Sequence, residues 1–103
     1  MKPLLLCLGF LTLLGMAGLT RAAGDVQAGK AKSSSCAMCH GANGEGKGAN
    51  PKLAGVAQGQ FVQAMEDFKS GKRKDPTMKT YADPLSAADI ANLAAYYASL
   101  GGK

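Results

Sequence analysis

Two cysteines and a histidine within five residues, Cys36-Ala37-Met38-Cys39-His40, constrain this chain more than any other feature. On a helical turn, residues three and four positions apart lie on the same face. The two thiols and the imidazole are therefore expected to project together from one short piece of backbone. The 103-residue sequence has three cysteines and one histidine, so this segment holds its only histidine.

Such a cluster fits the covalent attachment of haem. Haem carries two vinyl groups on one edge and an iron atom at its centre. Cys36 and Cys39 would form thioether bonds to that edge, and His40 would reach the iron as its proximal ligand. Cys-x-x-Cys-His is the attachment signature of c-type haem. The motif therefore predicts one covalently bound haem c.

Three other interpretations of the motif are weaker. A zinc site needs four ligands, and the sequence offers no second cysteine pair and no further histidine. A thioredoxin-like redox pair belongs in a βαβ unit, and no strand pattern is visible. A disulfide between Cys36 and Cys39 would close a very short loop and add little stability. Haem attachment is favoured over all three.

Residues 1–22 are typical of a cleaved secretory signal peptide. A basic start is followed by an apolar run from Leu4 to Leu19 and by small residues. Cleavage after Ala22 is favoured over cleavage after Ala23, which would put Arg21 where the peptidase prefers a small residue. The alternative is an uncleaved membrane anchor, but the run falls short of the roughly 18 apolar residues of a spanning helix.

Cleavage would leave residues 23–103 as one small exported domain, located in the periplasm, and would remove Cys7. It would also lower the formal net charge of +5 by two, because Lys2 and Arg21 are lost. An exported protein of such modest charge is a poor match for a nucleic-acid partner. A domain of this size is marginally stable without a staple, a metal or a cofactor, which again favours haem.

The apolar spacing predicts an all-α fold with three main helices. The first starts at its N-cap Asp25 and runs toward Cys36, and the second covers residues 60–70. The third follows Ser86, whose spacing to Asp89 fits a capping box, and ends at Gly101.

Two segments between these helices are expected to be irregular. Residues 40–59 are rich in glycine and lysine, which favours a flexible loop. Residues 72–84 contain Pro76 and Pro84, and proline in a helix interior removes a backbone hydrogen bond.

The second axial ligand of the iron decides what such a site can do. Met38 lies inside the attachment turn, on the His40 side, and cannot reach across the ring. Met65 shares a helical stripe with Phe61 and Phe68, so a core position is favoured for it. Met78, in the irregular segment, can approach the far face of a flat cofactor. Met78 is therefore the expected sixth ligand, and a thioether in that place raises the reduction potential.

The sequence also resembles the class I cytochromes c, most closely the small monohaem bacterial type and the domain repeated in dihaem periplasmic members. The resemblance covers nearly all of residues 23–103. It rests on the following segments, which occur in the family's order: Gly24-Asp25-Val26-Gln27-Ala28-Gly29-Lys30, Cys36-Ala37-Met38-Cys39-His40-Gly41, Pro51-Lys52-Leu53-Ala54-Gly55, Gly71-Lys72-Arg73 with Met78, Leu85-Ser86, and Leu93-Ala94-Ala95-Tyr96-Tyr97.

This resemblance implies a class I cytochrome c fold, in which loops and three main helices wrap one haem. The first and last helices are then expected to cross, with Gly29 close to Leu93 and Tyr96. The Pro51 carbonyl is expected to accept the ring N–H of His40, which makes the imidazole a better donor to iron. From the residues alone, Pro51 fits a plain loop position equally well, because turns favour proline. The chain has no tryptophan, so a role that tryptophan plays beside the propionates in some relatives is absent here or falls to Tyr81.

The expected function is one-electron transfer between redox proteins of a respiratory chain, not enzymatic catalysis. The basic residues Lys69, Lys72, Arg73, Lys74 and Lys79 surround Met78 and could steer the protein onto acidic redox partners. A merely solvated polar segment explains them nearly as well. Two alternatives to a free carrier stay open: a haem subunit of a dehydrogenase or oxidase complex, and a ligand-binding haem protein.

Overall fold

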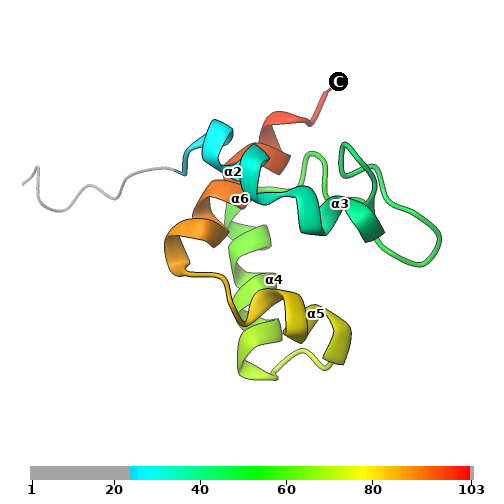
Figure 1. The fold of residues 1–103 in the computed structure, drawn as a ribbon, viewed down its shortest axis with the longest axis vertical. Coiled ribbons are helices and arrows are strands. Elements are labelled where there is room, and N and C mark those ends of the chain that lie inside the picture. Colours follow the sequence, from blue (N-terminus) through cyan, green and yellow to red (C-terminus); the bar gives the residue numbers. More distant parts are fainter. Residues whose placement is uncertain (1–23, 103) are drawn as a thin grey trace, which may run out of the picture.

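The computed structural model describes residues 24–102, so the expected signal peptide, residues 1–22, lies outside the described residues. Within the described residues the chain forms five helices and no β-strand, which confirms the all-α prediction (Figure 1). No helix of this part of the chain is both long and apolar enough to cross a membrane. The helices are α2 (Val26–Lys32), α3 (Ser34–His40), α4 (Gln58–Ser70), α5 (Pro76–Ala82) and α6 (Ala87–Ser99).

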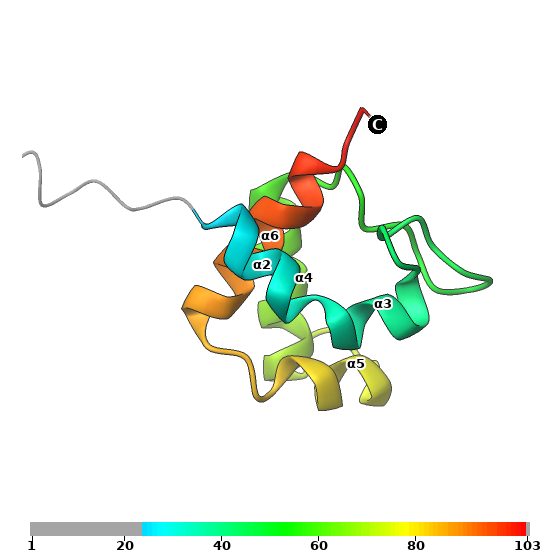
Figure 2. The same cartoon turned by 45° about the horizontal axis from the view of Figure 1, so that its top comes forward.

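The first predicted helix is divided into α2 and α3 at Ser33. It begins as predicted, because the Asp25 carboxylate accepts the Gln27 backbone N–H at 3.0 Å. At the other end the Ser33 hydroxyl donates to the Lys30 carbonyl at 2.8 Å. Serine side chains compete with the backbone for such bonds and disfavour helix interiors. The prediction of one helix as far as Cys36 is therefore wrong, and α3 leaves α2 in a new direction (Figure 2).

The second predicted helix is present as α4. It begins at Gln58, two residues earlier than expected, and ends at Ser70 as predicted. Gly71 follows with φ 84°, the left-handed conformation that glycine adopts readily at helix ends. One face of α4 is buried through Phe61, Met65 and Phe68.

The sequence analysis expected residues 72–84 to be irregular, and this is wrong for Pro76–Ala82, which form the helix α5. Pro76 occupies the first turn of α5, where its missing N–H removes no helical hydrogen bond. The Asp75 carboxylate caps this turn by accepting the Met78 backbone N–H at 3.0 Å. The prediction failed because proline was interpreted as a helix breaker, whereas here it starts a helix. Met78 therefore lies on a helix and not on a loop.

The third predicted helix, α6, is the centre of the core. Ser86 and Asp89 form the expected capping box, with both hydrogen bonds at 3.0 Å. α2 packs across α6, and the crossing point is Gly29. A Cβ atom at Gly29 would overlap the Asn92 carbonyl oxygen and lie 2.8 Å from the Tyr96 Cβ. The crossing of the first and last helices is thus confirmed, with Asn92 and Tyr96 as the near neighbours.

The loop between α3 and α4 is irregular, as predicted, apart from an isolated bridge between Lys47 and Asn50. Gly44 has φ 68°, and a Cβ there would lie 2.7 Å from the ring of Tyr97. The Gly44 carbonyl accepts the Leu53 backbone N–H at 2.8 Å. These contacts fold the loop back on itself, which brings its second half beside α3.

Candidate functional site

A cavity of about 740 Å³ lies between α3, the second half of the α3–α4 loop, α4 and α5. Small-molecule and cofactor sites typically have volumes of about 300–1,000 Å³. In Figures 1 and 2, α3 and α5 both project to the same side of α4. Residues of all three helices line the cavity. All five residues that the sequence analysis assigned to the site line this one cavity: Cys36, Cys39, His40, Pro51 and Met78.

α3 presents the two thiols and the imidazole to the cavity. Cys36 is half-buried and Cys39 is exposed, and no disulfide joins them. Burial is the main cause that raises the pKa of the Cys36 thiol. Burial therefore keeps Cys36 in the thiol form, and the thiol is less readily oxidised to a disulfide than the thiolate.

The imidazole of His40 is oriented by the loop that follows it. Its Nδ1 lies 2.8 Å from the Pro51 carbonyl oxygen, and only 6% of the residue is exposed. A carbonyl can only accept, so Nδ1 carries the proton and Nε2 keeps its lone pair for a metal. The loop is fastened to α3 next to this bond, because the Asn50 side chain donates to the Cys39 carbonyl at 2.9 Å. The ring is therefore held in one tautomer and one orientation.

The three methionines among the described residues differ in their position relative to the cavity. Met38 is 73% exposed and does not line it. Met65 lines the cavity from α4 but is also buried in the core, where the sequence analysis placed it. Met78 lines the cavity from α5 and is half-buried.

Several cavity residues were not assigned to the site by the sequence analysis, which named only Tyr81 among them as a possible replacement for a tryptophan of some relatives. Phe61 and Phe68 were interpreted as core, and they are buried, yet they also form an apolar wall of the cavity. Arg73 lines the cavity with its guanidinium 4.8 Å from the centre of the Phe68 ring. Tyr81, which is 42% exposed, lies at the lining as well. An apolar helical stripe packs a core or a cofactor equally well, so periodicity alone could not reveal this second role.

The donor set fits haem c. Two free thiols can each form one thioether bond, and a neutral imidazole nitrogen and a thioether sulfur are ligands that haem iron accepts. The wall formed by α4 is mainly apolar, through Phe61, Ala64, Met65 and Phe68, and suits the apolar faces of a porphyrin.

Comparison with known proteins agrees with this chemistry. The sequence model of the Cytochrome c family matches residues 26–101. The chain belongs to the cytochrome c family. Haem c is accordingly its cofactor, and the class I fold is confirmed.

Relatives from three bacteria illustrate the match. Cytochrome c4 of Pseudomonas aeruginosa is 44% identical over 95 residues, which span 91% of this chain and 47% of that protein. The crystal structure of reduced cytochrome c4 from Pseudomonas stutzeri superposes with a TM-score of 0.72 at 35% identity, covering 79% of this chain and 48% of that one. A thiosulfate dehydrogenase electron acceptor of Thiomonas intermedia is 39% identical over 71 residues, 67% of this chain and 33% of its own. The chain thus spans about half the length of the cytochrome c4 relatives.

Proposed function

We propose that this cytochrome c domain is a one-electron carrier, with haem attached through Cys36 and Cys39 and the iron bound by His40 and Met78. The observation that carries the proposal is the shared cavity, which is lined by both thiols, by the oriented imidazole and by the Met78 thioether. Two strong ligands leave no vacant position for a substrate, so such a site passes electrons and does not bind reactants.

The chemistry that haem c supplies is a one-electron couple whose potential depends on its axial ligands and surroundings. The residues of this chain set those conditions. The Pro51 carbonyl orients His40 and increases its donor strength. The Met78 sulfur raises the potential, and the apolar wall that Phe61 and Phe68 form keeps water from that side of the site.

A ligand-binding or peroxidase-type haem protein is the alternative from another class. Acid–base work on a bound peroxide needs a positioned proton acceptor, most often a histidine. His40 is the only histidine in the sequence, and its Nδ1 is already bonded to Pro51. We therefore favour the electron carrier.

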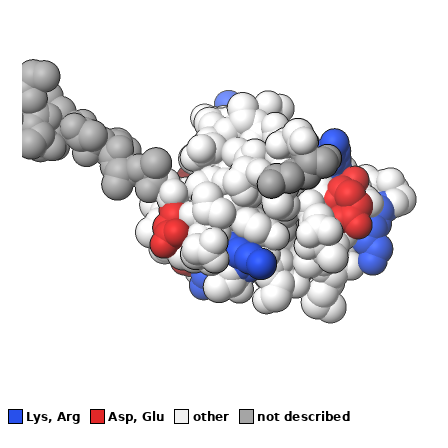
Figure 3. All heavy atoms as spheres, turned by 90° about the horizontal axis from the view of Figure 1, so that it is seen from above, with Lys and Arg blue, Asp and Glu red and all other residues white. Residues whose placement is uncertain are grey.

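The proposed partners are redox proteins with acidic docking surfaces. The face of the molecule at the C-terminal end of α6 carries few charged side chains, and these gather toward two of its edges (Figure 3). The basic residues around Met78 instead lie near the end of α4 and on α5. If they steer association, the electron-transfer rate to a partner should fall as salt increases.

We further propose a periplasmic location, with residues 1–22 removed as a signal peptide. The name of the Thiomonas intermedia relative describes an electron acceptor for a dehydrogenase, which supports a redox partner of this kind. It equally supports the second candidate, a haem subunit that works within a dehydrogenase complex. Co-purification of this chain with a catalytic subunit would favour that candidate over a free carrier.

The visible spectrum of the purified, haem-loaded protein tests the proposal. The reduced form should be low-spin, and the oxidised form should show a methionine–iron charge-transfer band. Met78→Ala should remove the band, whereas Met38→Ala, at an exposed position away from the cavity, should keep it. A band that survives in Met78→Ala would transfer the ligand role to Met65. Rapid uptake of carbon monoxide by the unaltered protein would refute the closed site.

A further inference from the structure

The helix that carries Met78 is short and has little buried surface of its own. α5 has seven residues, and isolated helices shorter than about 12–15 residues are marginal in water. Ala82 is the only residue of α5 that is buried, and Met78 is half-buried. The position of α5 must therefore depend on its contacts with neighbouring segments.

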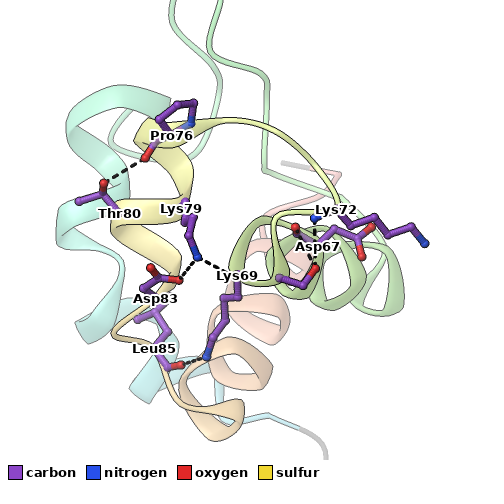
Figure 4. A network of polar contacts seen from close by, with 9 residues as sticks. Asp67, Lys69, Lys72, Pro76, Lys79, Thr80, Asp83 and Leu85 are labelled. Atoms are coloured by element: carbon purple, nitrogen blue, oxygen red, sulfur yellow. Dashed lines mark hydrogen bonds and ion pairs between the residues drawn. The ribbon is translucent and has the colours of Figure 1, made fainter.

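Two lysines make those contacts in a reciprocal way (Figure 4). Lys79, on α5, donates from Nζ to the carbonyl of Lys69 in the last turn of α4 at 2.8 Å. Lys69, on α4, donates from its own Nζ to the carbonyl of Leu85, which follows α5, at 2.6 Å. The Lys79 ammonium also lies 3.2 Å from the Asp83 carboxylate. We call Lys69, Lys79 and these acceptors the lysine clamp.

The acceptors suit an ammonium group. The carbonyl of Lys69 belongs to the C-terminal end of α4, where the helix dipole is negative and cations are favoured. Hydrogen bonds from a charged donor are stronger than neutral ones. The clamp thus holds α5 against α4 in two places. Lys79 binds α5 itself to the last turn of α4, and Lys69 binds α4 to Leu85 in the connection that follows α5.

The other end of α5 is fastened separately. The backbone N–H of Arg73 donates to the Asp67 carbonyl at 3.0 Å, which fixes the turn after α4. Asp75 then caps α5 through the backbone N–H of Met78 itself. Met78 therefore lies between the cap and the clamp, directly before Lys79 in sequence.

We propose that Lys69 and Lys79 are positioning residues that hold the Met78 sulfur at the iron by fastening α5 to α4. This inference rests on the proposed role of Met78 as axial ligand. It assigns to these two lysines a role inside the molecule, distinct from the steering of partners that their charge alone suggested.

Competition with added imidazole measures how firmly Met78 is held in the oxidised, haem-loaded protein. Imidazole binds only to molecules in which Met78 has left the iron, so its apparent affinity increases in proportion to that fraction. A charged hydrogen bond in a half-exposed position contributes modestly, so Lys69→Met and Lys79→Met should each increase the apparent affinity about threefold to tenfold. The double variant should show about the product of the two effects.

Lys72→Met is the matched control, because it removes the same charge from the same segment. The Lys72 side chain points away from α5, and its backbone N–H keeps its bond to the Ser70 hydroxyl at 3.2 Å (Figure 4). Its imidazole affinity should stay within the error of the unaltered protein. Equal increases in all three variants would show a general charge effect and would overturn the clamp.

Hydrogen exchange of the α5 amides in the haem-loaded protein gives a second readout. Lys69→Met and Lys79→Met should accelerate exchange in α5 but not in α6, whereas a general loss of stability would accelerate both. The two proposals fail in different ways. If Met78→Ala keeps the charge-transfer band, the ligand assignment is wrong. If that band is lost but the lysine variants leave both imidazole affinity and α5 exchange unchanged, the clamp is wrong.

Discussion

Replacement of Gly29 by alanine should destabilise the protein, although alanine is the better helix former. In a helix interior, alanine is favoured over glycine by about 1 kcal/mol. The added Cβ, however, would overlap the Asn92 carbonyl oxygen and lie 2.8 Å from the Tyr96 Cβ. Neither atom can rotate away, so α2 and α6 would have to separate. Overpacking typically costs about 1–3 kcal/mol, and with rigid neighbours we expect a net loss of about 2 kcal/mol.

Gly59→Ala is the matched control for this change. Gly59 also lies in a helix, in the first turn of α4, and a Cβ there would meet no atom within 4 Å. Since its backbone is helical, alanine should increase the stability by about 0.5 kcal/mol. The same substitution is therefore expected to lower the stability at Gly29 and to raise it at Gly59.

Equilibrium unfolding of the haem-loaded variants in guanidinium chloride measures both effects. The midpoint should decrease for Gly29→Ala and increase slightly for Gly59→Ala. The slope of the unfolding free energy against denaturant concentration should stay the same in both variants. Equal midpoints for the two variants would show that α2 and α6 do not meet as closely as the structure describes.

Three further predictions concern the cofactor and the caps. The double variant Cys36→Ala, Cys39→Ala, which cannot attach haem, should be largely unfolded, because its cavity of about 740 Å³ stays unfilled; a cooperative unfolding transition and a well-dispersed NMR spectrum would contradict this. Ser86→Ala should lower the free energy of unfolding by about 1 kcal/mol through loss of the α6 N-cap, measured by guanidinium titration. The hydrogen bond from the Ser86 backbone N–H lowers the pKa of Asp89 in the folded state. The Asp89 carboxylate therefore contributes its full share of stability above its pKa in the unfolded chain, and this share is lost as the pH falls through its pKa in the folded protein. Asp89→Asn should therefore flatten the acid side of the stability–pH curve, and an unchanged curve would refute that reasoning.

Local signals in the sequence predicted much of the fold. Asp25 and Ser86 start helices where their capping chemistry places them, and Gly71 ends one. The errors have the same local origin. Ser33 interrupts a helix by bonding to the backbone, and Pro76 begins one because Asp75 caps it. In both cases the physical signal was present, but Pro76 was interpreted only as a helix breaker and Ser33 was not interpreted at all.

The site was only partly predictable. The spacing of Cys36, Cys39 and His40 identified the attachment motif because its chemistry lies within one turn. The contact between His40 and Pro51 spans a loop and was expected only through family resemblance. The lysine clamp could not be predicted, since it depends on α5, which the sequence analysis took for an irregular segment.

The hollow enclosed by α3, α4 and α5 also has a consequence for the life of this protein in the cell. A copy that never received its prosthetic group would keep the cavity of about 740 Å³ unfilled and would open readily. Proteases degrade such open chains faster than closed ones. The same empty space that accepts the porphyrin thereby works as a quality check, under which only completed molecules accumulate.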